Sequence, residues 1–342
     1  MPGLLDVDLA AKTAARLAPP GPRLTLTDAA DVVVMLRDLT EQAEQHVRDV
    51  TGLHGVVGPA TVVDRPDWAR ANAEVFAVVL EPLAETLGKR QGKVGAAVTA
   101  RVSGVQVGTM LSWLSSKVLG QYEAFQPAGQ AGRLLLVAPN IVETERRLDV
   151  DPHDFRLWVT LHEVTHRTQF TAVDWLHDHV RGEIGALLGA SGLDDPQALV
   201  DRLKGLATGP RTGSLVELLQ TPEQRLVLDR VTAFMSLLEG HAEHVMDGVG
   251  PAVVPTVGLI RDRFDERRKE RGGPLDRLLR RLLGLDLKAL QYAEGKRFVD
   301  HCVGAVGMAG FNRVWESPAM LPTRTEIRDP AAWVTRLSAL PA

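Results

Sequence analysis

The sequence predicts a mainly α-helical protein with a small β-sheet, an α+β class in which one large multi-helix domain carries most of the chain. Apolar residues recur at steps of three and four along most of the 342 residues, whereas one short segment has the composition of a strand. Hydrophobic residues make up 45% of the chain, which is typical of a globular protein with a sizeable core. We expect an N-terminal arm over 1–26 and a single large domain over 27–342, with a sub-boundary near 125–150 as the alternative division.

The first helix is expected to follow a proline-containing N-terminal segment. Residues 1–26 show little periodicity, so we expect an extended arm that lies on the fold or a loose terminus. Helical spacing of apolar residues begins at Thr27, and Thr27 or Asp28 is placed to cap that helix. A second helix is expected over about 67–87.

The sequence of residues 103–142 predicts one closely packed helix and one strand. In residues 103–120, small residues such as Gly104 and Gly108 recur at a spacing of four, which permits close packing of a buried core helix. The apolar run 133–142 is the clearest strand candidate, and Pro139 is expected to close it. Further helices are expected at 151–170, 172–189, 195–204, 222–247, 256–270, 274–304 with an interruption near Gly284, and 329–338, with loops at 205–214 and 248–255.

The helix over 151–170, which should begin near Asp151 or Pro152, carries an HExxH pattern. Its two histidines, His162 and His166, are four positions apart and project from the same helical face, so they can bind one zinc ion together. Glu163 is rotated away from the metal and can contact a water there as the general base.

A third ligand is required, because catalytic zinc usually has three protein ligands and one water. The sequence departs from the HExxHxxGxxH pattern, since Gln169 and Ala172 occupy the positions of its glycine and third histidine. A carboxylate from a later helix is therefore expected. Glu239 is the favoured candidate, and Glu183 is the alternative.

Glu239 belongs to the segment FMSLLEGHAEHVMDG (234–248), which is dense in metal-binding residue types. Glu243 follows one turn later, where it could hydrogen-bond the second nitrogen of a histidine ligand. His241 and His244 are interpreted as partners on the flank of the helix, although either could be a ligand if the helix is rotated.

The segments HEVTHRTQF, EGHAEHVMD and LKALQYAEGKRFVDHC resemble a family of zincin-like metallopeptidases that is found largely in actinobacteria. The resemblance covers nearly the whole chain. It implies a zincin-like core around the HExxH helix, with zinc ligands at His162, His166 and Glu239 and with Glu163 as the base. It implies no particular substrate.

Two further features could shape such a site. An edge strand upstream of HExxH commonly holds an extended peptide in zincins, and the run 133–142 is the segment positioned to do this. Its alternative is a plain core strand. Tyr292 could donate a hydrogen bond to a developing oxyanion, or it could anchor a helix through its hydroxyl.

The pattern as a whole favours a zinc-dependent, peptidase-like metallohydrolase in which zinc-activated water attacks an amide of a peptide or small amide substrate. The alternative from another class is a catalytically inactive, zinc-stabilised binding or scaffolding protein. Hydrolysis of a small non-peptide molecule would use the same metal chemistry.

Composition argues against several other classes. The formal charge of -4 and the interleaved acidic and basic residues do not favour nucleic-acid binding. Cys302 is the only cysteine, so an intrachain disulfide and a thiolate metal site are both excluded. No segment has the roughly 20 apolar residues that cross a bilayer, and the start lacks a signal-peptide pattern. We therefore expect a cytoplasmic protein without a membrane or nucleic-acid partner.

Overall fold

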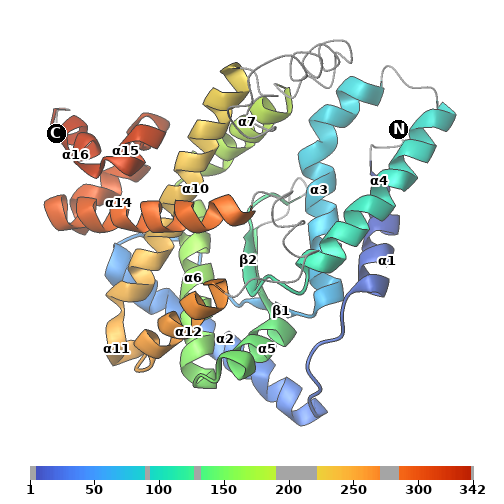
Figure 1. The fold of residues 1–342 in the computed structure, drawn as a ribbon, viewed down its shortest axis with the longest axis horizontal. Helices are drawn as coiled ribbons and strands as arrows, with labels where there is room; N and C mark the ends of the chain where they lie inside the picture. Colours follow the sequence, from blue (N-terminus) through green and yellow to red (C-terminus); the bar gives the residue numbers. More distant parts are fainter. Residues whose placement is uncertain (1–4, 89–92, 127–131, 190–221, 270–284, 340–342) are drawn as a thin grey trace.

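The computed structural model describes residues 5–88, 93–126, 132–189, 222–269 and 285–339. Within these residues, helices surround a small mixed sheet (Figure 1). The strands are β1 (Thr61–Val63), β2 (Gly120–Glu123) and β3 (Arg133–Val137). Their order is β1-β3-β2, in which β3 pairs in parallel with β1 and antiparallel with β2. The predicted class, mainly α with a small sheet, is therefore confirmed.

Most helices lie where apolar periodicity predicts them. Their bounds are α1 (Val7–Leu17), α2 (Leu26–Thr51), α3 (Arg65–Gly88), α4 (Lys93–Leu114), α5 (Ala138–Leu148), α6 (Pro152–Ala172), α7 (Leu176–Gly189), α10 (Pro222–Gly248), α11 (Gly250–Val253), α12 (Val257–Lys269), α14 (Leu285–Phe311), α15 (Arg324–Arg328) and α16 (Pro330–Ser338), with short 3-10 turns at Asn312–Trp315 and Pro318–Met320. The predicted helix 195–204, the loop 205–214, and residues 274–284 with the expected interruption lie outside the described residues. Among the described helices, none combines the length and hydropathy that a membrane crossing requires.

The N-terminal segment differs from the expected extended arm, because it contains helix α1, capped by Asp6. Its buried face is made of alanines, which give a weak periodic signal. They pack against the small residues of α4. A β-carbon on Gly104 would lie 2.8 Å from the Asp6 carbonyl oxygen, and one on Gly108 would lie 2.5 Å from that of Ala10. The predicted close packing is therefore confirmed, although the outer face of α4, with Val98 59% exposed, is not buried.

Several predicted boundaries are wrong: the helix expected over 103–120 is α4, which ends at Leu114 before β2 begins, and the loop expected over 248–255 contains α11 (Gly250–Val253). Helix α2 is capped by Thr25, which forms a capping box with Asp28, rather than by Thr27 or Asp28. Strand β3 ends at Val137, and α5 begins at the next residue with Pro139 in its first turn. Proline is favourable at this position of a helix because its missing N–H would have no helical partner there.

β3 is covered on both faces, which explains its continuous apolar sequence. Leu134 and Leu136 belong to a hydrophobic cluster with α2, α5 and α6, whereas Leu135 and Val137 belong to a cluster with α1, α3 and α4. A third cluster joins α7, α10 and α14 to the C-terminal helices. The single large domain over 27–342 stays a prediction.

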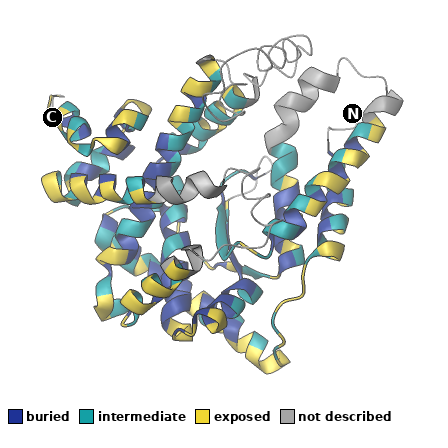
Figure 2. Cartoon of the chain, viewed as in Figure 1, coloured by how far each residue is buried: buried dark blue, intermediate teal, exposed yellow. Residues whose placement is uncertain are grey.

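Helix α6 runs through the centre of the molecule, and Figure 2 shows buried residues gathered there and exposed residues along the outer faces of α4 and α14. Asp151 caps α6 by accepting a hydrogen bond of 2.9 Å from the Asp154 N–H, as the sequence predicts. Two buried arginines fix the helix to its neighbours. Arg156 pairs with Glu145 of α5 at 2.6 Å, and Arg167 pairs with Glu44 of α2.

Helices α10 and α14 cross with almost no space between their backbones. A β-carbon on Gly240 of α10 would lie 2.2 Å from the carbonyl carbon of Gly295 in α14. A β-carbon on Gly295 would lie 1.9 Å from the Ser236 carbonyl oxygen. Only glycine allows this contact, and Gly240 directly follows the candidate ligand Glu239. The crossing therefore supports α10 at the point where the metal ligand is expected.

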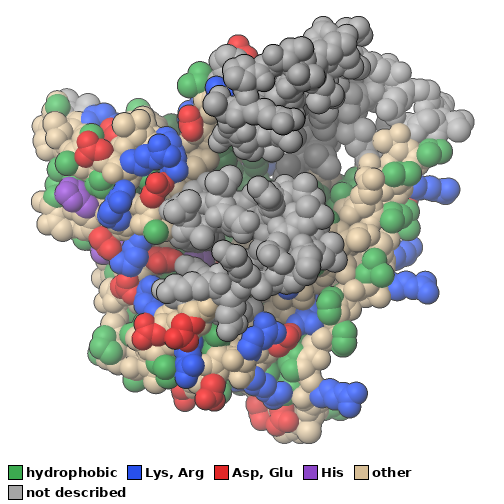
Figure 3. All heavy atoms as spheres, viewed as in Figure 1, with side chains coloured by type: hydrophobic (Ala, Val, Ile, Leu, Met, Phe, Trp, Pro, Cys, Tyr) green, Lys and Arg blue, Asp and Glu red, His purple; other side chains and the backbone are tan. Residues whose placement is uncertain are grey.

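The surface viewed in Figure 3 carries both signs of charge. Acidic and basic side chains are interspersed along the lower part of the described surface. This matches the interleaving of charges in the sequence.

We expect Gly295→Ala to lower the free energy of unfolding by about 1–3 kcal/mol, the usual cost of overpacking a rigid contact. Gly304→Ala in the same helix is the matched control, because a β-carbon there would have no described atom within 4 Å. This control should be neutral or slightly stabilising. Urea denaturation of both variants measures the difference, and equal effects would contradict the close crossing.

Candidate metal centre

A cavity of about 1110 Å³ lies beside the HExxH pattern, between α6, α7, α10 and β2. Its wall is mainly apolar and aromatic. Side chains on both sides of the HExxH turn contribute, among them Phe125, Trp158, Phe170, Phe234, Met246 and Phe264. His162, Glu163, His166 and Glu239 also line the cavity. The polar groups that the sequence singles out therefore converge in a mostly apolar recess, which is typical of a ligand-binding site.

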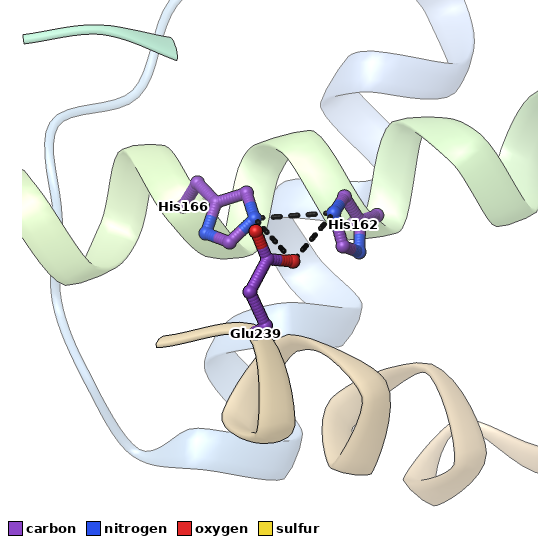
Figure 4. A group of neighbouring side chains, drawn as sticks. All are labelled: His162, His166 and Glu239. Atoms are coloured by element: carbon purple, nitrogen blue, oxygen red, sulfur yellow. Dashed lines mark hydrogen bonds and ion pairs between the residues drawn. The ribbon is translucent and has the colours of Figure 1, made fainter. Parts of the chain in front are cut away.

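His162 and His166 project from α6 toward Glu239 of α10, as Figure 4 shows. Their Nε2 atoms are 3.1 Å apart. Oε2 of Glu239 is 3.6 Å from Nε2 of His162 and 3.7 Å from Nε2 of His166. The structure therefore brings together the three side chains that the sequence predicts as metal ligands.

The spacing of these atoms fits one divalent ion. Ligand atoms bound to zinc at about 2.0–2.1 Å with tetrahedral angles lie about 3.3 Å from one another. The three separations, 3.1, 3.6 and 3.7 Å, lie on both sides of that value. Two imidazoles and one carboxylate are also a common donor set of catalytic zinc. The residues therefore fit such an ion with little rearrangement.

Nδ1 of His166 has a partner that the sequence analysis did not assign. It lies 2.9 Å from Oε1 of Gln169, one turn later on α6. Nε2 of Gln169 in turn lies 3.0 Å from the Leu238 carbonyl oxygen and 3.0 Å from Nδ1 of His241. The role expected for Glu243, a hydrogen bond to the second nitrogen of a ligand, is thus taken by Gln169 at His166.

The other candidates of the 234–248 segment face different surroundings. His241 is a core residue, with its ring centroid 5.6 Å from that of Phe311. Burial lowers the pKa of His241 to about 3, and the neighbouring His244 and His166 add to the effect. His244 is a partner on the helix flank, since its Nδ1 lies 2.7 Å from Oδ1 of Asp300. Glu243 lines the cavity, 3.6 Å from a guanidinium nitrogen of Arg261.

Glu163 lies under β2, where the absence of a side chain at Gly120 makes room for it. A β-carbon at Gly120 would lie 2.6 Å from Cγ and 3.0 Å from Oε1 of Glu163. Burial raises the pKa of Glu163 to about 7; His166 opposes the rise and Glu239 adds to it. A carboxyl group with this pKa can both accept and release a proton near neutral pH.

The pKa of His166 is also raised, but by neighbouring groups rather than by burial. Burial by itself lowers the pKa of its imidazole, but the hydrogen bond and charge of Glu239 outweigh burial, and the charge of Glu163 adds to them. The result is a pKa of about 9. The two carboxylates therefore create a site that attracts positive charge, whether a proton or a metal ion.

One predicted candidate, Glu183, does not join the group. Glu183 of α7 lines the cavity but is bound by Arg230, whose Nε lies 2.9 Å from Oε1. The structure therefore brings Glu239, rather than Glu183, to the histidines. Tyr292 belongs to α14, and its side chain lies outside the described residues.

The sheet topology corrects the prediction of which strand could hold a substrate. β3, from the predicted run 133–142, is the central strand, and the edge strand that lines the cavity is β2. The Val137 N–H donates to the Leu119 carbonyl, so these two residues form a hydrogen-bonded pair. Hydrogen-bonded and non-hydrogen-bonded pairs alternate along an antiparallel ladder, so Gly120 and Tyr122 do not hydrogen-bond to β3. The backbone groups of Gly120 and Tyr122 therefore point away from β3, to the edge of β2 that pairs with no other described strand. β2 was missed because it is short and lacks apolar alternation.

The fold and the site together define a zincin-type protein, in which an HExxH helix faces a glutamate from a later helix. Comparisons with known proteins agree. The family model described as zincin-like metallopeptidase matches residues 5–334. The chain therefore belongs to the zincin-like metallopeptidase family, and the resemblance inferred from the sequence is confirmed.

A solved structure from Chloroflexus aurantiacus is also similar. It is described as "a putative hydrolase with a novel fold" and is 31% identical in sequence. The alignment covers 98% of this chain and 100% of that chain, with a TM-score of 0.71. Among curated proteins, none matches the sequence. At a coarse level, the comparisons support a metallohydrolase.

Proposed function

We propose that this protein is a zinc-dependent hydrolase of amide bonds, with peptides as its substrate class. One observation carries the proposal: His162, His166 and Glu239 converge within ligand distance of one another in an open cavity, with Glu163 beside them. The family and the hydrolase described for the structural neighbour support the same class of reaction.

Zinc bound to these three side chains would act as a Lewis acid and would lower the pKa of a water in the remaining position. Glu163 removes a proton from the attacking water and returns it to the nitrogen of the leaving amine. Its pKa of about 7 suits both transfers. Its burial under β2 holds the carboxylate in one place and keeps bulk water from competing for it.

The open edge of β2 supports an extended peptide as the substrate. Gly120 and Tyr122 direct their N–H and C=O groups away from β3, so a peptide strand can pair with them next to Glu163. The aromatic and aliphatic side chains at both ends of the cavity favour large apolar residues on either side of the scissile bond.

The alternative, a zinc-stabilised scaffold, would need a closed coordination sphere, such as a fourth protein ligand from His241 or His244. Within the described part of the chain, the metal-binding group contains three side chains. His241 is bound to Gln169, and His244 is bound to Asp300. This arrangement favours a hydrolase with one position left for water.

The first prediction concerns metal content. We expect about one zinc per chain in protein purified without chelators, and near-complete loss after dialysis of His162→Ala, His166→Ala or Glu239→Ala. Glu183→Ala is the control, because Glu183 lines the same cavity but pairs with Arg230. Mass spectrometric metal analysis makes the comparison. Equal losses for Glu239→Ala and Glu183→Ala would remove Glu239 from the ligand set.

The second prediction separates the base from the ligands. Glu163→Gln keeps the size of the side chain and a hydrogen-bonding end but removes the carboxylate, so zinc content should be unchanged. Hydrolysis of peptides with apolar residues around the scissile bond should fall by a factor of about 10² to 10⁴. Full activity of this variant would contradict the role of Glu163, and a wild type inactive on broad peptide libraries would favour the scaffold.

The third prediction tests the contact between β2 and the base. In Gly120→Ala, the added methyl group displaces the end of the Glu163 side chain, so kcat should drop at least about tenfold while zinc stays bound. Gly304→Ala, where the added β-carbon would meet no described atom within 4 Å, should keep full activity. Unchanged kcat in Gly120→Ala would show that Glu163 does not need its position under β2.

A further inference from the structure

Gln169 is a fully buried amide whose hydrogen-bonding groups connect the two helices that carry the candidate ligands. Its Oε1 atom is 2.9 Å from Nδ1 of His166 on its own helix. Its Nε2 atom is 3.0 Å from the Leu238 carbonyl oxygen and 3.0 Å from Nδ1 of His241, both on α10. Leu238 is the residue before Glu239, so the amide lies between the second and third ligands.

The chemistry of these partners fixes the orientation of the amide. The Leu238 carbonyl can only accept a hydrogen bond, so it must face the NH₂ group of Gln169. A flipped amide would set two oxygens against each other. Oε1 therefore faces His166 and can only accept, which requires a proton on Nδ1 of that imidazole.

The orientation has a direct consequence at the metal site. A neutral imidazole carries one proton, so a proton on Nδ1 leaves a lone pair on Nε2. Nε2 is the atom of His166 that faces His162 and Glu239. By the same logic, Nδ1 of His241 accepts from Gln169, and the proton of His241 is on its Nε2 atom.

We propose that Gln169 is a positioning residue: it fixes the metal-binding tautomer of His166 and, through Leu238 and His241, sets α10 so that Glu239 reaches the same ion. The inference rests on the proposed metal site. Sequence spacing could suggest it, because Gln169 is one turn after His166, but its partners on α10 come from the tertiary structure.

The test compares zinc affinity in full-length variants, measured by competition with a chromophoric chelator. Gln169→Met removes the acceptor at similar volume, so zinc affinity should fall about 10- to 100-fold. Gln169→Glu restores an acceptor for Nδ1 of His166 but not the donor to the Leu238 carbonyl, so affinity should recover only part of this loss. Its stability should still fall, because the Leu238 carbonyl loses its donor.

The control is Thr160→Val, which also removes a buried side-chain hydrogen bond in α6, to the Arg156 carbonyl, without contacting a ligand. Zinc affinity should be unchanged in this variant. A second readout is the visible spectrum of the Co²⁺-loaded proteins, which should shift for Gln169→Met and return toward that of the wild type for Gln169→Glu. If affinity instead follows stability across all three variants, Gln169 has only a structural role and the proposal is overturned.

The wild type provides a measurement that does not depend on folding of a variant. In the zinc-loaded wild type, nitrogen-15 NMR of labelled histidines should find His241 protonated at Nε2 and His166 at Nδ1; the opposite tautomer at either residue would overturn the proposal. None of these measurements uses a substrate. A wild type that binds no zinc would overturn the proposed function, whereas a zinc-binding wild type with equal affinity in Gln169→Met would overturn this inference alone.

Discussion

The contact between α6 and α10 is the constraint on which the site depends. Two histidines one turn apart can present nitrogens to one ion, but a single helix cannot supply the third ligand at the required distance. In the proposed site, Glu239 of α10 takes this place, with Oε2 3.6 Å from Nε2 of His162 and 3.7 Å from Nε2 of His166. Helix α14 lies directly behind this point, because Gly240 and Gly295 allow the two backbones to touch. A shift of α10 by one turn would remove the glutamate from the site.

Burial of charge at this contact explains the unusual proton affinities. Glu163 and Glu239 lie beside the imidazole of His166, largely out of contact with bulk water, so burial and neighbouring charge shift the pKa of Glu163 and of His166. Burial raises the pKa of Glu163 to about 7, while the carboxylates raise that of His166 to about 9. Such a site favours a bound cation. Elsewhere on α6, the buried Arg156 and Arg167 are paired with Glu145 and Glu44, so they fix the helix to its neighbours.

The sheet contributes more to the site than its size suggests. β3 is enclosed by two hydrophobic clusters and anchors the sheet, and this leaves β2 as the edge strand over the cavity. On β2, Gly120 makes room for Glu163 on one side and presents its backbone to the open edge on the other. One glycine thus connects the position of Glu163, the proposed base, to the place where the proposed peptide substrate would lie.

The sequence by itself determined the helical class and the pair His162 and His166 with Glu163, because helix periodicity and i, i+4 spacing depend only on local geometry. It could not reveal α1, whose buried face is made of small alanines, or β2, which has no apolar alternation. Which of Glu239 and Glu183 lies beside the two histidines, and the hydrogen bonds from His166 through Gln169 to α10, were decided by the tertiary structure. Both depend on which residues of distant helices meet, and that follows from the packing of the whole chain rather than from any local pattern.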